Sequence, residues 1–241
     1  MTYLGDIFRY VHVIFGAVGL LAFWVPVFAK KGAVNHVRFG KIFVWSAYVV
    51  LAAAAISLST RGVDLYQQGI GPADEPQLIA FLVFLGYLTL VTFVIVRHGM
   101  QVLKSKARPA DIKTTLNTVL AYAAIAASVF VIVYAIALSP PNKILLLALS
   151  PIGIGNGYTQ LKYMAGARKS PRAWLYEHLG AMLGSGIAFH TAFAVFGSAR
   201  LFDIGLSGWV AVIPWVAPAI IGIPAISIWT RHYQRKYREV A

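Results

Sequence analysis

Seven long apolar segments, separated by short polar stretches, dominate the hydrophobic pattern of the chain. A helix that crosses a bilayer needs about 20 mostly apolar residues, because it rises about 1.5 Å per residue. Each segment comes close to this length. The segments cover residues 8–28, 42–60, 78–97, 116–138, 143–161, 174–197 and 208–230. The pattern predicts an all-α integral membrane protein, a seven-transmembrane-helix bundle that forms a single domain over residues 1–241.

Positively charged residues alternate with the predicted helices. Seventeen of the 21 Lys and Arg residues follow the first, third, fifth and seventh segments, which places them on one side of the membrane. The remaining four share the other side with five of the eight acidic residues. Because short basic loops stay in the cytoplasm, the N-terminus is predicted outside and the C-terminus in the cytoplasm. We expect a bacterial cytoplasmic membrane, with the basic loops facing an anionic inner leaflet.

Composition agrees with this interpretation and excludes several other classes. Hydrophobic residues make up 59% of the chain and charged residues 12%, about half the share of roughly 25% in a soluble domain. The net charge of +13 does not predict nucleic-acid binding, because the basic residues form short clusters between apolar runs rather than one basic face. The absence of cysteine excludes disulfides and cysteine-ligated metal or iron–sulfur sites.

Two histidines within predicted helices are candidate haem ligands. His12 in the first helix and His190 in the sixth both fall in the outer half of the membrane. Two neutral imidazoles at one depth could ligate haem b from opposite faces. The alternative is that each histidine donates a hydrogen bond to a neighbouring helix.

A second cluster of ionisable residues is predicted at the inner end of the sixth helix. Glu177 is the one acidic residue that the pattern places within a span, and His178 follows it. With His36 from the loop after the first helix, they could bind a divalent metal such as zinc, which accepts imidazole and carboxylate ligands. The alternative is an ion pair between Glu177 and a basic residue at the membrane interface.

The fifth segment carries helix-breaking residues in its middle. Pro151 removes one helix hydrogen bond, and three glycines follow within six residues. Non-helical backbone at membrane depth occurs where it lines a cavity, and broken helices often frame substrate or ion sites. The polar side chains of such a cavity would be Ser150, Asn156 and Tyr158. The alternative is a kinked helix that packs tightly at its glycines.

Two glycine pairs with a spacing of four residues predict close helix packing. Gly153 and Gly157 lie in the fifth segment, and Gly180 and Gly184 lie in the sixth. Such pairs let the backbones of neighbouring helices approach each other.

Several short stretches resemble a bacterial family of predicted membrane proteins that is catalogued as a domain of unknown function. The stretches are residues 12–16 (HVIFG), 30–32 (KKG), 36–41 (HVRFGK), 177–185 (EHLGAMLGS) and 191–193 (TAF). The resemblance implies a multi-helix membrane protein and favours His12, His36 and His178 as functional positions. It also implies a small residue where this chain has His190, which would make a haem site peculiar to this protein.

These observations lead to three functional hypotheses. The first is a histidine-ligated membrane protein that holds haem b or a divalent metal in a redox role. The second is a small-molecule transporter or binding protein with its cavity at the broken fifth helix. The third is an accessory subunit, with a membrane complex or a second copy of the chain as its partner.

Overall fold

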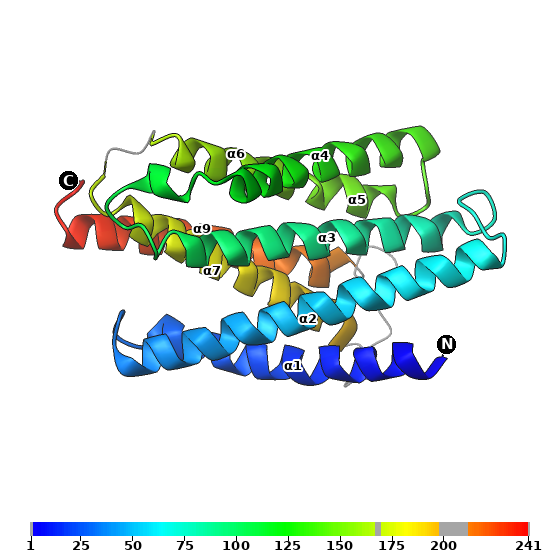
Figure 1. Ribbon diagram of the computed structural model, residues 1–241, viewed down its shortest axis with the longest axis horizontal. Helices are drawn as coiled ribbons and strands as arrows, with labels where there is room; N and C mark the ends of the chain where they lie inside the picture. Colours follow the sequence, from blue (N-terminus) through cyan, green and yellow to red (C-terminus); the bar gives the residue numbers. More distant parts are fainter. Residues whose placement is uncertain (1, 167–169, 198–211, 241) are drawn as a thin grey trace. The chain divides into compact units, whose positions relative to one another are not determined.

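The computed structural model describes residues 2–166, 170–197 and 212–240, and every regular element among them is helical (Figure 1). The longer helices alternate with short connections. The elements are α1 (Thr2–Phe28), α2 (Val34–Gln67), α3 (Pro76–Gln101), η1 (Pro109–Ile112), α4 (Thr115–Leu138), α5 (Lys143–Leu149), α6 (Pro151–Met164), α7 (Ala173–Ala192), η2 (Phe193–Gly197) and α9 (Ile213–Lys236). Two of them, the 3₁₀ turn η1 and the π-helical turn η2, are absent from the sequence prediction.

Seven of the described helices are long and apolar enough to cross a membrane. Two spans combine two elements each: α5 with α6 over Lys143–Met164, and α7 with η2 over Ala173–Gly197. The predicted all-α class and the number of spans are therefore confirmed, and the chain is a polytopic membrane protein by the length and composition of its helices. The predicted start of the seventh segment, residues 208–211, lies outside the described residues.

Two helices, α2 and α3, extend well beyond the apolar segments within them. The predicted loop residue His36 belongs to the first turn of α2, and the predicted outer loop from Arg61 begins only after Gln67. Likewise α3 continues past residue 97 and includes His98. Hydropathy predicted the helix ends incorrectly because polar residues at a membrane interface continue a helix without being apolar.

The chain forms two compact units. Unit 1 comprises residues 1–94 and 114–161, and unit 2 comprises residues 95–113 and 162–241. The boundaries fall inside α3 and α6, whereas boundaries between independent domains usually fall in linkers. The division therefore does not split the chain into successive sequence domains, and each unit is described by itself below.

In unit 1, α1 and α2 pack side by side as a helical hairpin (Figure 1). The ring centroids of Phe23 and Phe43 lie 5.4 Å apart between them. Lys31 in the connecting turn donates hydrogen bonds to the carbonyls of Pro26 and Val27, at 2.7 and 2.8 Å. Its ammonium group thereby satisfies carbonyl groups at the end of α1 and interacts favourably with the negative end of the helix dipole.

The glycine pair of α6 also packs as predicted, against α4. A Cβ atom on Gly153 would overlap the Ser128 hydroxyl group and lie 2.7 Å from the Ala124 carbonyl oxygen. A Cβ on Gly157 would lie 2.5 Å from the carbonyl oxygen of Ala121. The two backbones therefore approach closely at these positions, as close packing at small residues requires.

The predicted break at Pro151 is a junction between two helices, not a stretch of non-helical backbone. Ser150 keeps right-handed helical dihedrals, and its N–H donates to Leu146. The hydroxyl group of Tyr87 on α3 lies 2.7 Å from the Ser150 carbonyl oxygen and accepts the Gly153 N–H at 3.0 Å. A side chain thus enters the helix ladder next to the proline, which is a known cause of kinks. The kinked-helix alternative is the one that the structure supports.

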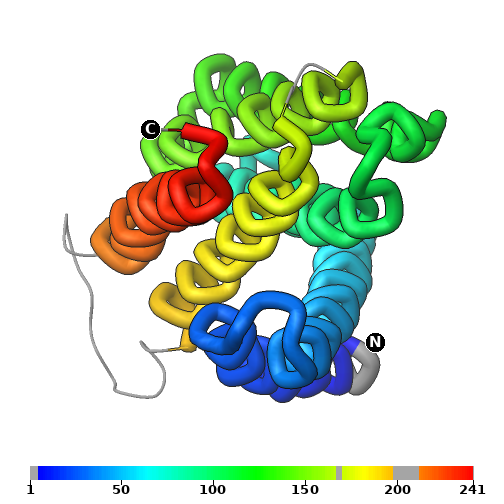
Figure 2. The backbone as a smooth tube through the Cα atoms, turned by 90° about the vertical axis from the view of Figure 1, so that its left-hand side faces the viewer, coloured from blue at the N-terminus to red at the C-terminus, as the bar shows by residue number. Residues whose placement is uncertain are grey.

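In unit 2, α7 contacts the end of α3 and also packs against α9, which Figure 2 shows beside it. The close approach to α3 occurs at Gly99, where a Cβ would overlap Met182 and lie 2.8 Å from Ala181 Cβ. In contrast, nothing described lies within 4 Å of a Cβ on Gly180 or Gly184. The prediction of close packing at that pair was wrong, because the contact face of α7 carries Ala181 and Met182 instead.

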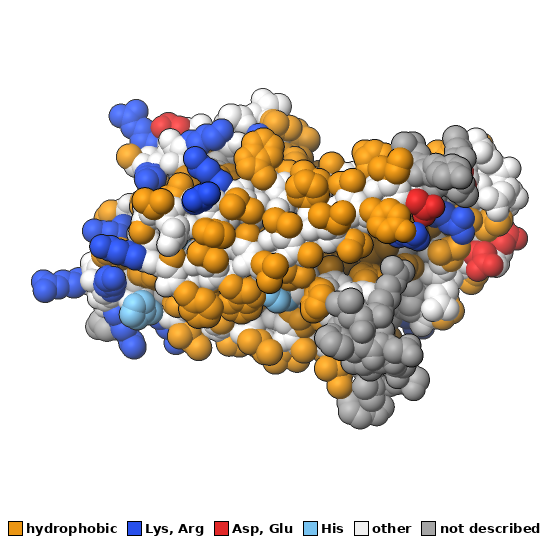
Figure 3. Space-filling model, turned by 90° about the horizontal axis from the view of Figure 1, so that it is seen from below, with side chains coloured by type: hydrophobic (Ala, Val, Ile, Leu, Met, Phe, Trp, Pro, Cys, Tyr) orange, Lys and Arg blue, Asp and Glu red, His pale blue; other side chains and the backbone are white. Residues whose placement is uncertain are grey.

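Large hydrophobic side chains cover the exposed faces of the helices, as Figure 3 shows over α1. Leu21 and Phe28 are both 77% exposed. In water such a surface would be unstable, whereas in a bilayer it contacts lipid tails and stays solvated. The exposed apolar residues on α1 are Ile7, Tyr10, Val13, Ile14, Phe15, Val18, Leu21, Trp24 and Phe28.

Candidate functional site: a buried histidine–glutamate pair

A histidine and a glutamate form a buried pair in unit 2. Nε2 of His98 on α3 lies 3.2 Å from Oε2 of Glu177 on α7. The side chains are only 7% and 5% exposed. Ionisable groups inside a membrane span are costly and are therefore candidates for function. This pair is the strongest candidate site among the described residues.

The pair exists because α3 and α7 approach each other closely at Gly99. The missing side chain at Gly99 lets α7 approach, and His98 is its direct neighbour on α3. One residue beyond Glu177, Nδ1 of His178 lies 2.8 Å from the Gly99 carbonyl oxygen. Two consecutive residues of α7 thus contact two consecutive residues of α3, which fixes the register between the helices.

One aromatic side chain packs directly against the pair. Tyr163 is fully buried, and its ring meets the His98 imidazole edge to face, with centroids 5.7 Å apart. In the first turn of α7, the ring of Trp174 lies 4.6 Å from the ammonium group of Lys106. A buried ring therefore covers the imidazole, and a cation lies over the start of the helix that carries Glu177.

The pair brings an imidazole and a carboxylate into one buried contact. Nε2 of His98 and Oε2 of Glu177 lie 3.2 Å apart, within hydrogen-bond distance. At such a separation a positioned imidazole and a carboxylate can exchange a proton.

The four histidines predicted as ligands share one hydrogen-bonding pattern. In each, Nδ1 lies within hydrogen-bond distance of a backbone carbonyl: His12 with Val50 at 3.1 Å, His36 with Pro26 at 3.1 Å, His178 with Gly99 at 2.8 Å and His190 with Gly186 at 2.7 Å. Because a carbonyl only accepts, Nδ1 carries the proton in every case. For His12 the bond matches the alternative of a hydrogen bond to a neighbouring helix, whereas the acceptor of His190 lies one turn earlier in its own helix. His12 belongs to unit 1 and His190 to unit 2.

No group of three or more His, Asp or Glu side chains within the described ranges is arranged to hold a metal ion. In place of a metal contact, Glu177 has His98 as its partner. The divalent metal site at His36, Glu177 and His178 thus stays a prediction without support from the structure.

The three polar residues predicted for a cavity in the fifth span differ in their surroundings. Ser150 is fully buried and donates to Leu147, whereas Tyr158 is 61% exposed. Asn156 donates its side-chain amide to the Ile152 carbonyl, one turn earlier in the same helix. Nothing in these contacts directs the three side chains toward a common space.

A second charged cluster in unit 2 holds the C-terminal tail. The carboxylate of Glu239 accepts hydrogen bonds from Tyr176 at 2.6 Å, Ser170 at 2.7 Å and Arg172 at 3.3 Å. Burial alone would raise the pKa of Glu239, but these three donors and the positive charge of Arg172 outweigh it and lower the pKa below its ordinary value of 4.5. Arg172 also lies over the ring of Tyr237, 4.4 Å from its centroid.

Two residues with central contacts, His98 and Tyr87, were missed from the sequence. His98 lies just outside the predicted span 78–97, next to Arg97. A local signal was present, since the adjacent Gly99 is a residue at which helices can approach closely. Tyr87 lies among apolar residues of α3, and nothing local distinguishes it from a lipid-facing tyrosine.

Comparison of the chain with protein-family models, curated proteins and solved structures finds no match. The resemblance to a family of predicted membrane proteins therefore stays an expectation from the five short stretches.

Proposed function

We propose that this protein transports protons, alone or coupled to a solute, and that the His98–Glu177 pair is its proton-binding element. The observation that carries the proposal is the 3.2 Å contact between an imidazole and a carboxylate buried among apolar helices. Chains of histidine and acidic residues inside spans are typical of proton relays in transporters and pumps. The proposal moves the site of the transporter hypothesis from the fifth span to the contact of α3 with α7.

The position of the pair along its helices supports this role. His98 lies in the last turn of α3, and Glu177 lies near the start of α7. Both therefore lie close to a membrane interface rather than at mid-depth. From there a proton needs to cross only a short distance to reach water on one side.

The charge asymmetry of the sequence supports an orientation for this arrangement. The seventeen basic residues on one side favour a cytoplasmic position for the loop between α3 and α4, in a bacterial cytoplasmic membrane. In that orientation the N-terminus is outside, and His98 and Glu177 exchange protons with the cytoplasm. The basic loops then contact an anionic inner leaflet.

Proton flux into liposomes tests the proposal. The purified protein is reconstituted with an entrapped pH-sensitive dye, and a potassium gradient with valinomycin drives proton entry. We expect a rate above that of protein-free liposomes, reduced at least about tenfold by Glu177→Gln or His98→Asn. The matched controls are Glu75→Gln and His232→Gln, which remove a carboxyl group and an imidazole that do not belong to the pair.

Two results would contradict the proposal. One is a proton flux equal to that of protein-free liposomes while the reconstituted protein remains folded. The other is a flux that Glu177→Gln leaves unchanged. Loss of flux in the two control variants as well would also count against a specific role of the pair.

Haem b or metal binding is the second candidate function, supported by one observation. The Nδ1 contact of His12 with the Val50 carbonyl leaves Nε2 as the nitrogen with the lone pair, as in histidines that ligate metals and haem. His12 would be one of the axial ligands. An absorption spectrum of the protein purified after growth with a haem precursor tests this, and a Soret band lost in His12→Ala would support it. A preparation with neither the band nor bound metal would exclude it.

A further inference from the structure

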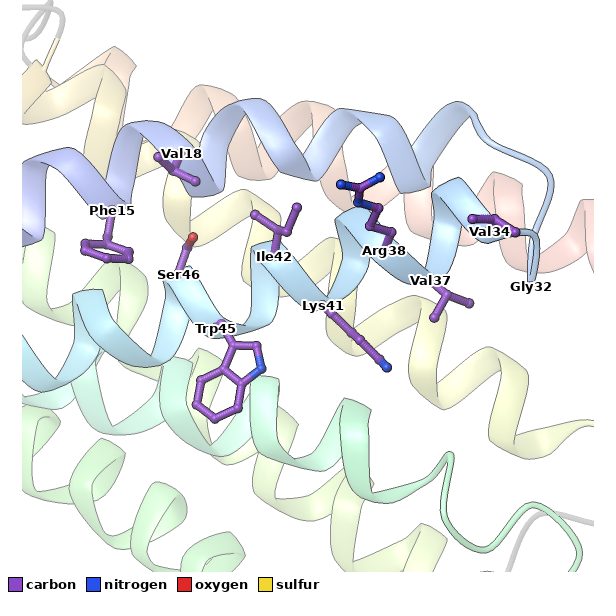
Figure 4. Close-up of a pocket in the computed structure, with 10 residues that line it drawn as sticks. All are labelled: Phe15, Val18, Gly32, Val34, Val37, Arg38, Lys41, Ile42, Trp45 and Ser46. Carbon is purple, nitrogen blue, oxygen red and sulfur yellow. The ribbon is translucent and has the colours of Figure 1, made fainter.

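A groove runs along the exposed side of the α1–α2 hairpin in unit 1 (Figure 4). Its volume is about 820 Å³, within the range of about 300–1,000 Å³ for pockets that hold small molecules. Most of its lining comes from one stripe of α2, from Val34 to Ser46. At about 1.5 Å of rise per residue this stripe is about 18 Å long. The groove is therefore long enough to accommodate an extended chain.

The part of the groove farther from the connecting turn is apolar. Phe15 and Val18 line it from α1, and Ile42 and Trp45 line it from α2. Trp45 is 69% exposed and Val18 41%. Because this stretch belongs to two candidate membrane spans, its opening faces hydrocarbon rather than water. An apolar chain would fit here without desolvating any charged group.

The part nearer the turn carries two cations. Arg38 and Lys41 are both exposed and stand one turn apart on α2. Figure 4 shows Arg38 directed toward α1 and Lys41 directed away from it, so that they flank α2 at the same end of the groove. Within the described part of the chain, no acidic residue forms an ion pair with either, whereas Arg9 pairs with Asp6 and Arg172 with Glu239.

The neighbouring Lys31 satisfies the carbonyls at the end of α1 with two hydrogen bonds within the hairpin. Arg38 and Lys41 differ from it, because both are exposed and line the groove next to its apolar part. That combination is complementary to a molecule with an anionic head and an apolar tail.

We infer that the groove binds one anionic phospholipid, with its phosphate near Arg38 and Lys41 and an acyl chain along Phe15, Val18 and Ile42. A free anion would leave the apolar length empty, and a zwitterionic lipid would bring its own cationic group next to its phosphate and so offer less net negative charge to the two cations. The inference depends on membrane insertion of α1 and α2 but not on proton transport by the His98–Glu177 pair. A failed proton-flux experiment would therefore not affect it.

Native mass spectrometry of the detergent-solubilised protein tests the site. The protein is titrated with phosphatidylglycerol or with phosphatidylcholine of the same acyl chains. We expect one phosphatidylglycerol to be retained in preference to phosphatidylcholine. The double variant Arg38→Gln/Lys41→Gln should bind phosphatidylglycerol about thirty-fold more weakly, since each cation near a lipid surface contributes roughly fivefold.

Two further variants separate the site from general charge attraction. Lys30→Gln/Lys113→Gln removes two exposed cations that do not line the groove, and it should retain phosphatidylglycerol like the unmodified chain. Val18→Trp narrows the apolar part at an exposed position while keeping both cations, and it should weaken retention. Circular dichroism confirms that each variant is folded.

The inference is overturned by any of three results. These are equal retention of the two lipids by the unmodified protein, equal weakening by the two double variants, and full competition by millimolar inorganic phosphate. The last result would mean that the cations bind a free anion and that the apolar groove does not contribute.

Discussion

The hydroxyl group of Tyr87 on α3 accepts a hydrogen bond from the backbone N–H of Gly153 on α6, at 3.0 Å. The same oxygen lies 2.7 Å from the carbonyl of Ser150 and 3.1 Å from that of Leu149. In a membrane, unsatisfied backbone groups find no water and cost several kcal/mol each. One side chain therefore stabilises the helix junction next to Pro151.

Replacing Tyr87 by Phe removes this hydroxyl and leaves buried backbone groups without a partner. We expect a loss of stability of about 1–3 kcal/mol, seen as a lower melting temperature of the detergent-solubilised protein. Tyr122→Phe is the control, because Tyr122 is 58% exposed on α4. An equal effect of the two changes would contradict the role of Tyr87.

Substitution of the α6 glycines should depend on which face of the helix they occupy. Gly153→Ala places a methyl group against the Ser128 side chain and the α4 backbone, and the strain of overpacking is about 1–3 kcal/mol. Gly155→Ala adds a methyl group with nothing described within 4 Å and should be neutral or stabilising, because alanine favours helix. Thermal unfolding of both variants measures the difference, and equal melting temperatures would refute the close packing of α6 on α4.

The same comparison can be made in α3. Gly99→Ala should push α7 away from α3 and lower stability by about 1–3 kcal/mol, because the Ala181 Cβ stands 2.8 Å from the added atom. Gly86→Ala, in the same helix but with open space around it, serves as the matched control. If the α3–α7 contact positions His98 against Glu177, Gly99→Ala should also reduce proton flux while Gly86→Ala should not.

A double-mutant cycle on His98 and Glu177 measures their coupling. Each single change to Leu removes one side of the buried contact, and breaking a buried ionisable pair typically costs about 3–5 kcal/mol. The double variant removes both groups, so it should be more stable than the sum of the single effects predicts, by about 1–3 kcal/mol. Strict additivity in thermal or denaturant unfolding would show that the pair does not interact.

The tail contact at Glu239 should make stability depend on pH. Because the folded state holds the pKa of Glu239 below its ordinary value of 4.5, the folded state favours the ionised carboxylate. The stabilisation is therefore complete well above pH 4.5 and is lost as the pH falls through the lowered pKa of the folded state. Glu239→Gln should lower the melting temperature by about 3 °C at pH 7, and this difference from the unmodified protein should shrink as the pH falls below 4.5. A constant difference across that range would contradict the linkage.

Local sequence determined the elements of this protein. A run of about 20 apolar residues can satisfy its backbone hydrogen bonds in a bilayer only as a helix. Each span could therefore be predicted from its own residues. The close packing at Gly153 and Gly157 was also predicted from the sequence, because a helix with two small residues one turn apart presents a surface on which another backbone can lie. The kink at Pro151 followed from the missing N–H alone.

Tertiary structure decided which residues meet. Apolar composition carries little information about helix neighbours in a membrane, since lipid tails are as apolar as leucine. Gly180 and Gly184 therefore looked equivalent to the α6 pair, although it is Gly99, on another helix, that permits the close approach of α7. His98 and Glu177 are 79 residues apart in sequence, and only the packing of α7 on α3 makes them one buried pair.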